Sequence, residues 1–189
     1  LPMTLSSSMP WQIGFINIER PGRGVTVSAM GINGAQLSQW SKWRPGMWED
    51  LAQTKADLII LAYGTNEAFS GNLDISSTER TWRNYIRQIK NTLPNAGILI
   101  LGAPESLKTA YGSCGNRPVL LSEVQQMQQR IARDEKIMFW SWQDAMGGAC
   151  SMKNWMAQGL AAKDGVHFSA QGYETAADKL ADSLIRFAQ

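Results

Sequence analysis

The chain has 189 residues, of which 44% are apolar, and it carries 18 basic and 16 acidic residues. This length and composition predict one folded domain with a full core and argue against disorder. The net charge of +2, with no basic stripe, favours neither nucleic acid nor a membrane surface as a partner, and no apolar run approaches the roughly 18 residues of a membrane span. The chain starts at Leu1 with no signal peptide, so we expect a processed product or a piece of a longer polypeptide.

The first twenty residues have the least regular pattern. Residues 11–18 alternate partway like a strand, and a Pro21-Gly22 turn follows. We therefore predict that residues 1–20 are the tail of a preceding or inserted β module, and that residues 21–189 are the main domain.

From residue 24 onward, short apolar runs alternate with amphipathic stretches, which is typical of a parallel sheet covered by helices. The predicted strands are residues 24–30, 58–62, 98–101 and 137–140. The second and third are continuous apolar runs, so we expect them to be buried on both faces.

Three amphipathic helices are predicted between and after these strands. The first follows a predicted capping box of Ser76 and Glu79, and its apolar residues recur at helical spacing: Trp82, Tyr85, Ile86, Ile89 and Leu93. The second has the same pattern at Leu120, Val124, Met127 and Ile131. The last begins after Ser169 as N-cap, and we expect it to bury one stripe: Tyr173, Ala176, Ala177, Leu180, Ala181, Leu184 and Ile185.

Cys114 and Cys150 are the two cysteines, and each lies in a Gly-rich loop. A disulfide between them would indicate an oxidising compartment and would stabilise the fold by roughly 3 to 4 kcal/mol through chain entropy. Two inert buried thiols are the alternative. One histidine and two distant cysteines do not supply the clustered ligands of a zinc site.

Asp164 and His167 form the first candidate site. His167 is the only histidine of the chain, and histidine can both accept and return a proton near neutral pH. A carboxylate three residues away can fix the tautomer and charge of the ring. The pair predicts two members of a hydrolase triad, against the alternative of a structural histidine at a helix start.

Two loops follow predicted strands and carry further polar residues. In open α/β sheets ligands bind beyond the carboxyl ends of the strands, which is where residues 31–35 (Gly-Ile-Asn-Gly-Ala) and 63–67 (Tyr-Gly-Thr-Asn-Glu) lie. Each alone is most simply a turn. Together with Asp164 and His167, in this order, they indicate one site.

These segments resemble the SGNH (GDSL-type) hydrolases from about residue 24 to the C-terminus. The resemblance implies a three-layer, flavodoxin-like α/β fold with a mainly parallel sheet, with Gly34 and Asn66 as oxyanion-hole donors and Asp164 and His167 as the catalytic acid and base. The nearer likeness is to the peptidoglycan O-acetylesterase branch of Gram-negative periplasms, in which a β-rich carbohydrate-binding-like module is inserted between the serine and glycine blocks. Glu67 lies where many members have aspartate.

The resemblance implies an acetylesterase that acts on a glycan such as peptidoglycan through an acyl-enzyme, with no metal or cofactor. Attack on the ester puts negative charge on the carbonyl oxygen, and each preorganised N–H donor that stabilises it is worth about 10²- to 10³-fold in rate. His167 would take the proton of a serine and return it to the leaving alcohol, and Asp164 would stabilise the imidazolium.

The nucleophilic serine is missing from this pattern, because the family motif Gly-Asp-Ser occurs nowhere in the chain. The cluster at residues 6–8 follows no apolar strand, and a series of Ser113, Asp144 and His167 lacks the Gly-x-Ser-x-Gly context. We therefore expect the first strand of the sheet and its serine on a separate piece of the same protein.

Two other functions stay open at this level. One is a non-catalytic glycan-binding domain that kept the fold, and the other is an O-acetyltransferase in which a sugar hydroxyl replaces water.

Trp40, Trp43 and Trp48 are expected to fill the core, with sugar stacking as the alternative. Glu67 and Glu105 follow strands and are expected to be hydrogen-bond acceptors of the loops.

Overall fold

The computed structural model describes residues 8, 22 and 24–187. The chain divides into two compact units, residues 1–32 and 33–189, and each is considered by itself. The β module predicted over residues 1–20 falls outside the described residues except for Ser8, so its boundary stays a prediction.

In the first unit, residues 24–32 form neither helix nor strand and are exposed. Val25 and Val27 are 92% and 85% exposed. The strand predicted over residues 24–30 is therefore wrong for this structure. Apolar β-branched residues give a strand only when a neighbour pairs with their backbone, and in a flavodoxin-like strand order that neighbour is the first strand of the sheet.

The second unit is built on a three-stranded parallel sheet. Its strands are β1 (Leu58–Leu61), β2 (Gly97–Leu101) and β3 (Met138–Trp140), in the order β1-β2-β3. Ile60 pairs with Leu99 in the register of β1 with β2, and Leu101 pairs with Trp140 in that of β2 with β3. Three predicted strands and the parallel α/β class are thus confirmed.

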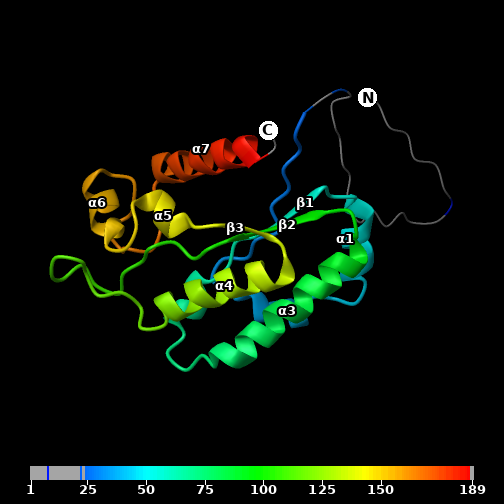
Figure 1. Ribbon diagram of the computed structural model, residues 1–189, viewed down its shortest axis with the longest axis horizontal. Helices are drawn as coiled ribbons and strands as arrows, with labels where there is room; N and C mark the ends of the chain where they lie inside the picture. The colour runs from blue at the N-terminus through cyan, green and yellow to red at the C-terminus, as the bar shows by residue number, and fades with distance from the viewer. Residues whose placement is uncertain (1–7, 9–21, 23, 188–189) are drawn as a thin grey trace. The chain divides into compact units, whose positions relative to one another are not determined.

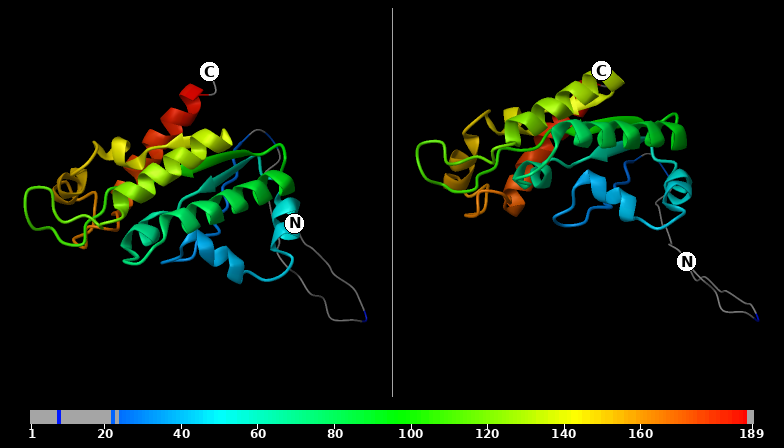
Figure 2. Two further views of the ribbon diagram at one scale, coloured as in Figure 1. Left: turned by 60° about the horizontal axis from the view of Figure 1, so that its bottom comes forward. Right: turned by 90° about the horizontal axis from the view of Figure 1, so that it is seen from below.

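Helices cover the two faces of the sheet (Figure 1). The helices α3 (Ile75–Thr92) and α4 (Leu121–Glu135) run side by side on one face (Figure 2). On the other side lies α7 (Ala170–Phe187), whereas α5 (Trp142–Met146) and α6 (Ser151–Ala157) lie beyond the end of β3 (Figure 1). Between β1 and the first unit the chain forms the 3-10 helix η1 (Leu37–Lys42) and α1 (Met47–Thr54), and α2 (Thr65–Phe69) follows β1.

The second unit has two cores. Trp82, Ile86 and Ile89 of α3 pack with Val124 and Met127 of α4 against β1 and β2. The second core contains a different set of buried residues, from the β2 loop to α7: Leu107, Met146, Met152, Trp155, Ala161, Phe168 and Ala176.

The start of α3 differs from the prediction. Asp74 is the N-cap, and its Oδ1 accepts hydrogen bonds from the N–H groups of Ser76 and Ser77 at 2.9 and 3.2 Å. Glu79 instead forms ion pairs with Arg83 and Arg130. The capping box of Ser76 and Glu79 is therefore wrong, because the aspartate two residues earlier satisfies the free amides first. Ser169, by contrast, accepts from the N–H of Gly172 as predicted for a cap.

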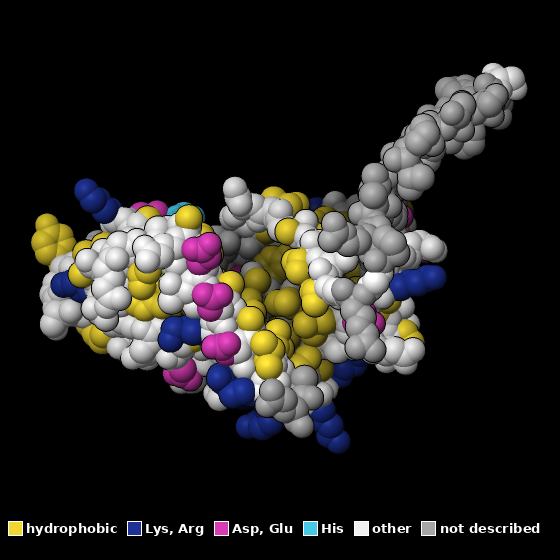
Figure 3. All heavy atoms as spheres, turned by 90° about the horizontal axis from the view of Figure 1, so that it is seen from above, with side chains coloured by type: hydrophobic (Ala, Val, Ile, Leu, Met, Phe, Trp, Pro, Cys, Tyr) yellow, Lys and Arg dark blue, Asp and Glu magenta, His cyan; other side chains and the backbone are white. Residues whose placement is uncertain are grey.

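The face of the sheet next to α7 is only partly covered. β2 is buried as predicted, but Ile60 in β1 is 43% exposed. In α7, only Ala176 of the predicted stripe is buried, whereas Tyr173 and Ile185 are 48% and 57% exposed. Hydrophobic side chains accordingly reach the surface on this face (Figure 3). The predicted burial of β1 and of the α7 stripe is wrong because a sheet of three strands covers less of the helix than its apolar stripe requires.

Gly172 allows α7 to start close to the preceding loop. A Cβ at this position would lie 1.9 Å from the carbonyl oxygen of Leu160. Gly172→Ala should lower the free energy of unfolding by about 1 to 3 kcal/mol, although alanine is the better helix former. Denaturant unfolding measures this difference, with Gly71→Ala as control, since a Cβ at Gly71 meets no atom within 4 Å. An unchanged or higher stability of Gly172→Ala would contradict the close packing.

Candidate active site

The turn from Asp164 to His167 holds an acid and a base in contact. The Oδ2 of Asp164 lies 2.7 Å from Nδ1 of His167, and its Oδ1 accepts from the N–H groups of Val166 and His167 at 2.9 and 3.0 Å. The bond to the His167 ring and those two amide bonds lower the pKa of Asp164 from 3.8 to about 2. The aspartate is thus ionised near neutral pH and orients the ring through Nδ1, which leaves Nε2 available for a substrate proton.

The fold fixes this turn from two sides. Gly165 has a positive φ of 70°, and its carbonyl accepts from the N–H of Leu107, in the loop after β2, at 2.8 Å. A Cβ at Gly165 would lie 3.0 Å from Cβ of Leu107. On the other side, the ring of Phe168 stacks on Trp142, with centroids 5.3 Å apart. The exposed side chains of Asp164 and His167 therefore stand on a backbone that the buried neighbours hold.

Asn66 lies beside the segment that contains Gly34. Its side-chain Nδ2 donates to the backbone carbonyl of Ala35 at 3.0 Å, and the backbone carbonyl of Asn66 accepts from Nε2 of Gln36 at 3.2 Å. Gly34 has a positive φ of 76° and nothing within 4 Å of a Cβ built on it. A side-chain amide has two N–H groups, and within the described residues the Nδ2 of Asn66 makes one hydrogen bond, to the residue that follows Gly34.

Gln128 joins the carboxyl ends of β1 and β2. This side chain of α4 is fully buried. Its Oε1 accepts from the N–H of Ala103 at 2.8 Å, and its Nε2 donates to the carbonyl of Tyr63 at 2.7 Å. The loop that carries Asn66 and the loop that leads to Leu107 are thereby tied to one another. The sequence analysis missed Gln128, although a glutamine on the apolar face of a helix, next to Met127, was the available signal.

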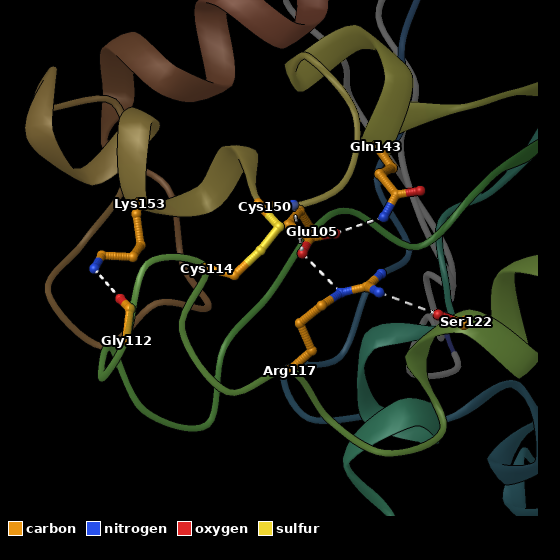
Figure 4. Close-up of a disulfide and its surroundings, with 8 residues drawn as sticks. All are labelled: Glu105, Gly112, Cys114, Arg117, Ser122, Gln143, Cys150 and Lys153. Carbon is orange, nitrogen blue, oxygen red and sulfur yellow. Dashed lines mark hydrogen bonds and ion pairs between the residues drawn. A yellow bond between two sulfur atoms is a disulfide. The ribbon is translucent and has the colours of Figure 1, made fainter.

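A disulfide and a buried ion pair fix the loop of residues 105–117 (Figure 4). Cys114 and Cys150 are bonded, with Cα atoms 4.7 Å apart. Glu105 is fully buried and lies 2.7 Å from Nε of Arg117. It also accepts from the side chain of Gln143 and from the N–H of Cys150. As expected, Glu105 is a hydrogen-bond acceptor in its loop, and here it joins that loop to the start of α6.

The structure gives no support to Ser113 as a nucleophile. Ser113 is exposed on this loop, and Nδ1 of His167 is bonded to Asp164. Asp144, which would be the acid in that series, lies in a surface hollow with Lys179.

The three clustered tryptophans surround a surface hollow of about 270 Å³. Trp40 stacks on Trp43 with ring centroids 4.8 Å apart, and its indole N–H donates to the hydroxyl of Tyr63 at 2.9 Å. Trp40 and Trp48 also pack against the core. Packing is therefore an observed role of these rings, and sugar stacking stays a hypothesis.

Among residues 24–187, no three His, Cys, Asp or Glu side chains gather as a metal site would require. Nor does any helix in that range combine the length and hydropathy needed to cross a bilayer.

Comparison with known proteins identifies one family. Residues 16–175 match the model of the GDSL-like lipase/acylhydrolase family. A solved structure of a peptidoglycan O-acetylesterase is 68% identical and superposes with a TM-score of 0.83 over 85% of this chain and 46% of that one. The chain therefore spans about half the length of that protein. No curated protein matches the sequence.

More distant structures share the fold alone. An acetyl xylan esterase is 16% identical, with a TM-score of 0.63 over 81% of this chain and 78% of its own. A lipase/acylhydrolase from Enterococcus faecalis is also 16% identical, with a TM-score of 0.54 over 75% of this chain and 66% of its own.

The Asp164–His167 contact predicts a pH dependence of stability. Because folding lowers the pKa of Asp164 from 3.8 to about 2, the ionised side chain stabilises the fold above pH 3.8, and this stabilisation is lost as the pH falls through 2. The free energy of unfolding of the wild type, minus that of Asp164→Asn, should therefore decrease between about pH 5 and pH 2. A constant difference over this range would contradict the contact.

Proposed function

Because the chain belongs to the GDSL-like lipase/acylhydrolase family, we propose that it supplies the acid, the base and the oxyanion-hole donors of a serine ester hydrolase. The observation that carries this proposal is the 2.7 Å contact between Asp164 and Nδ1 of His167, because it leaves the other ring nitrogen as a general base. Asn66, whose side chain bonds to Ala35 directly after Gly34, is proposed to supply with Gly34 the amide donors that stabilise the negative oxygen in acyl transfer.

The proposed reaction has two steps. His167 accepts the proton of the serine hydroxyl as the serine oxygen attacks the ester carbonyl, and the negative oxygen is stabilised by the amides of Gly34 and Asn66. The intermediate collapses when His167 returns the proton to the leaving alcohol, which leaves an acyl-serine. Water, activated by His167 in the same way, then releases the acid and regenerates the serine.

The proposed substrate is an O-acetyl group on a glycan, and specifically on peptidoglycan. The support is the peptidoglycan O-acetylesterase that is 68% identical to this chain. A periplasmic or otherwise exported location goes with this substrate and with the disulfide between Cys114 and Cys150.

The nucleophilic serine is proposed to lie on polypeptide outside these 189 residues. In the sheet of the described residues, β1 pairs only with β2, and Ile60 next to its free edge is partly exposed. A further parallel strand along β1 would pair that edge and would end on the side of the sheet where Asn66 lies. A glycan-binding domain without activity is the competing function, because the chain contains no Gly-Asp-Ser motif.

Hydrolysis of a chromogenic acetate ester tests the proposal. We expect slow or no turnover by the 189-residue chain, and activity in the polypeptide extended upstream of Leu1 to include a Gly-Asp-Ser block. In the active protein, His167→Ala should abolish turnover, and Asn66→Ala should lower kcat by about 10²- to 10³-fold because one oxyanion donor is lost.

Three outcomes would assign another function or another nucleophile. An extended protein that hydrolyses no acetate ester and resists a serine-directed phosphonate would be a binding domain. Faster acetyl transfer to an added glycan than to water would indicate a transferase. Full activity of the 189 residues alone would place the serine within them.

A further inference from the structure

Glu67 is a buried carboxylate to which the proposed reaction gives no role. It lies in the first turn of α2, directly after Asn66, and is 1% exposed. Burial away from water raises the pKa of Glu67 above its usual value, because the charged form loses its hydration. A buried carboxylate is costly unless hydrogen bonds compensate it, so its partners indicate why it is there.

The two oxygens of Glu67 bind two different segments of the site. Oε1 accepts from the N–H of Leu37 at 2.9 Å, and Oε2 accepts from the N–H of Gly64 at 2.9 Å. Leu37 starts η1 three residues after Gly34, and Gly64 precedes Asn66 by two residues. One carboxylate therefore bridges the segment with the backbone donor and the turn with the side-chain donor.

The turn at Gly64 is shaped so that this bridge can form. Gly64 has a positive φ of 123°, and a Cβ there would lie 2.8 Å from Nε2 of Gln128 and 2.9 Å from Cβ of Ala103. Only glycine fits between these groups in this conformation. The carbonyl of Tyr63 binds Gln128 and the N–H of Gly64 binds Glu67, so the peptide group between Tyr63 and Gly64 is held at both its oxygen and its nitrogen.

The other contacts between the two segments are less well protected from water. The bonds of Asn66 with the carbonyl of Ala35 and the side chain of Gln36 are partly buried and exposed, respectively. Hydrogen bonds in a low-dielectric interior are stronger than those exposed to water. The bridge through Glu67 is thus the dominant link between the two donors.

We propose that Glu67 is the positioning residue of the oxyanion hole: its carboxylate, by holding Leu37 and Gly64, sets the separation of the Gly34 and Asn66 donors. The inference rests on the proposed hydrolase function. It accounts for the glutamate of this chain: glutamine has one acceptor and one donor in place of two acceptors, and an aspartate, one methylene shorter, would not span the same two amides in the arrangement seen here.

Kinetics of the complete hydrolase test this role. Glu67→Gln and Glu67→Asp should each lower kcat by about 10- to 100-fold, because a displacement near 1 Å in a catalytic site costs about 10²-fold, while KM for the acetate ester changes little. Glu79→Gln is the matched control, since Glu79 forms one ion pair within α3, with Arg83, and one with Arg130 of α4. It should lower the melting temperature without lowering kcat.

An NMR measurement on the same protein separates this inference from the function. With glycine and asparagine labelled with ¹⁵N, Glu67→Gln should shift the backbone amide of Gly64, which loses its acceptor, and also those of Gly34 and the Asn66 side chain. If the complete protein has no esterase activity, the proposed function fails, and the resonances still report on the bridge.

Several results would overturn the inference. It is wrong if kcat of both variants stays within about twofold of the wild type, or if Glu79→Gln lowers kcat equally. It is also wrong if only Gly64 shifts, since the bridge would then not reach the donors. If both Glu67 variants fail to fold, the residue serves stability and the positioning role is excluded.

Discussion

The site depends on which groups form hydrogen bonds with the backbone N–H and C=O groups where the parallel strands end. A buried N–H or C=O that leaves the sheet must find another partner, because water is excluded there. At the end of β2, Gln128 accepts from the N–H of Ala103, and Gln125 donates to its carbonyl at 2.8 Å. At the end of β1, the same Gln128 binds the carbonyl of Tyr63 and Glu67 binds the N–H of Gly64. Side chains of α4 and α2 thus take over the pairing and fix the loops that carry the site.

The two halves of the candidate site are held in physically different ways. Asp164 and His167 form a local pair, because the aspartate binds both the ring and the amides of its own four-residue turn. Gly34 and Asn66 come from segments about 30 residues apart in sequence, and their relative position depends on long-range contacts. The contact between Asp164 and His167 is therefore made within one turn, whereas the relative position of Gly34 and Asn66 depends on contacts between distant segments, among them the bonds of Glu67 to Leu37 and Gly64.

The same distinction decides how much could be predicted from sequence. The apolar runs were sufficient to predict β1, β2 and β3, and the helical spacing of apolar residues was sufficient to predict α3 and α4. Both patterns are local in the sequence. The Asp164–His167 contact also follows from their spacing, and Gly34 and Asn66 were found through family resemblance, with their roles still predictions. The strand at residues 24–30 failed because its formation depends on a neighbour elsewhere in the sheet. Gln128 was missed because its two partners are 25 and 65 residues away.

The exposed apolar surface connects the fold with the proposed chemistry. Ile60 of β1 and Ile185 on α7 are 43% and 57% exposed. Within the described residues β1 has no second partner strand, and an unpaired edge is a site for pairing with another strand. The polar residues of the candidate site follow the carboxyl end of β1. A strand that paired with this edge in parallel would also end there, so the segment that buries Ile60 would bring its next residue towards Asn66. Pairing of the β1 edge, which has no partner strand among the described residues, and placement of a residue beside Asn66 would then follow from the same strand.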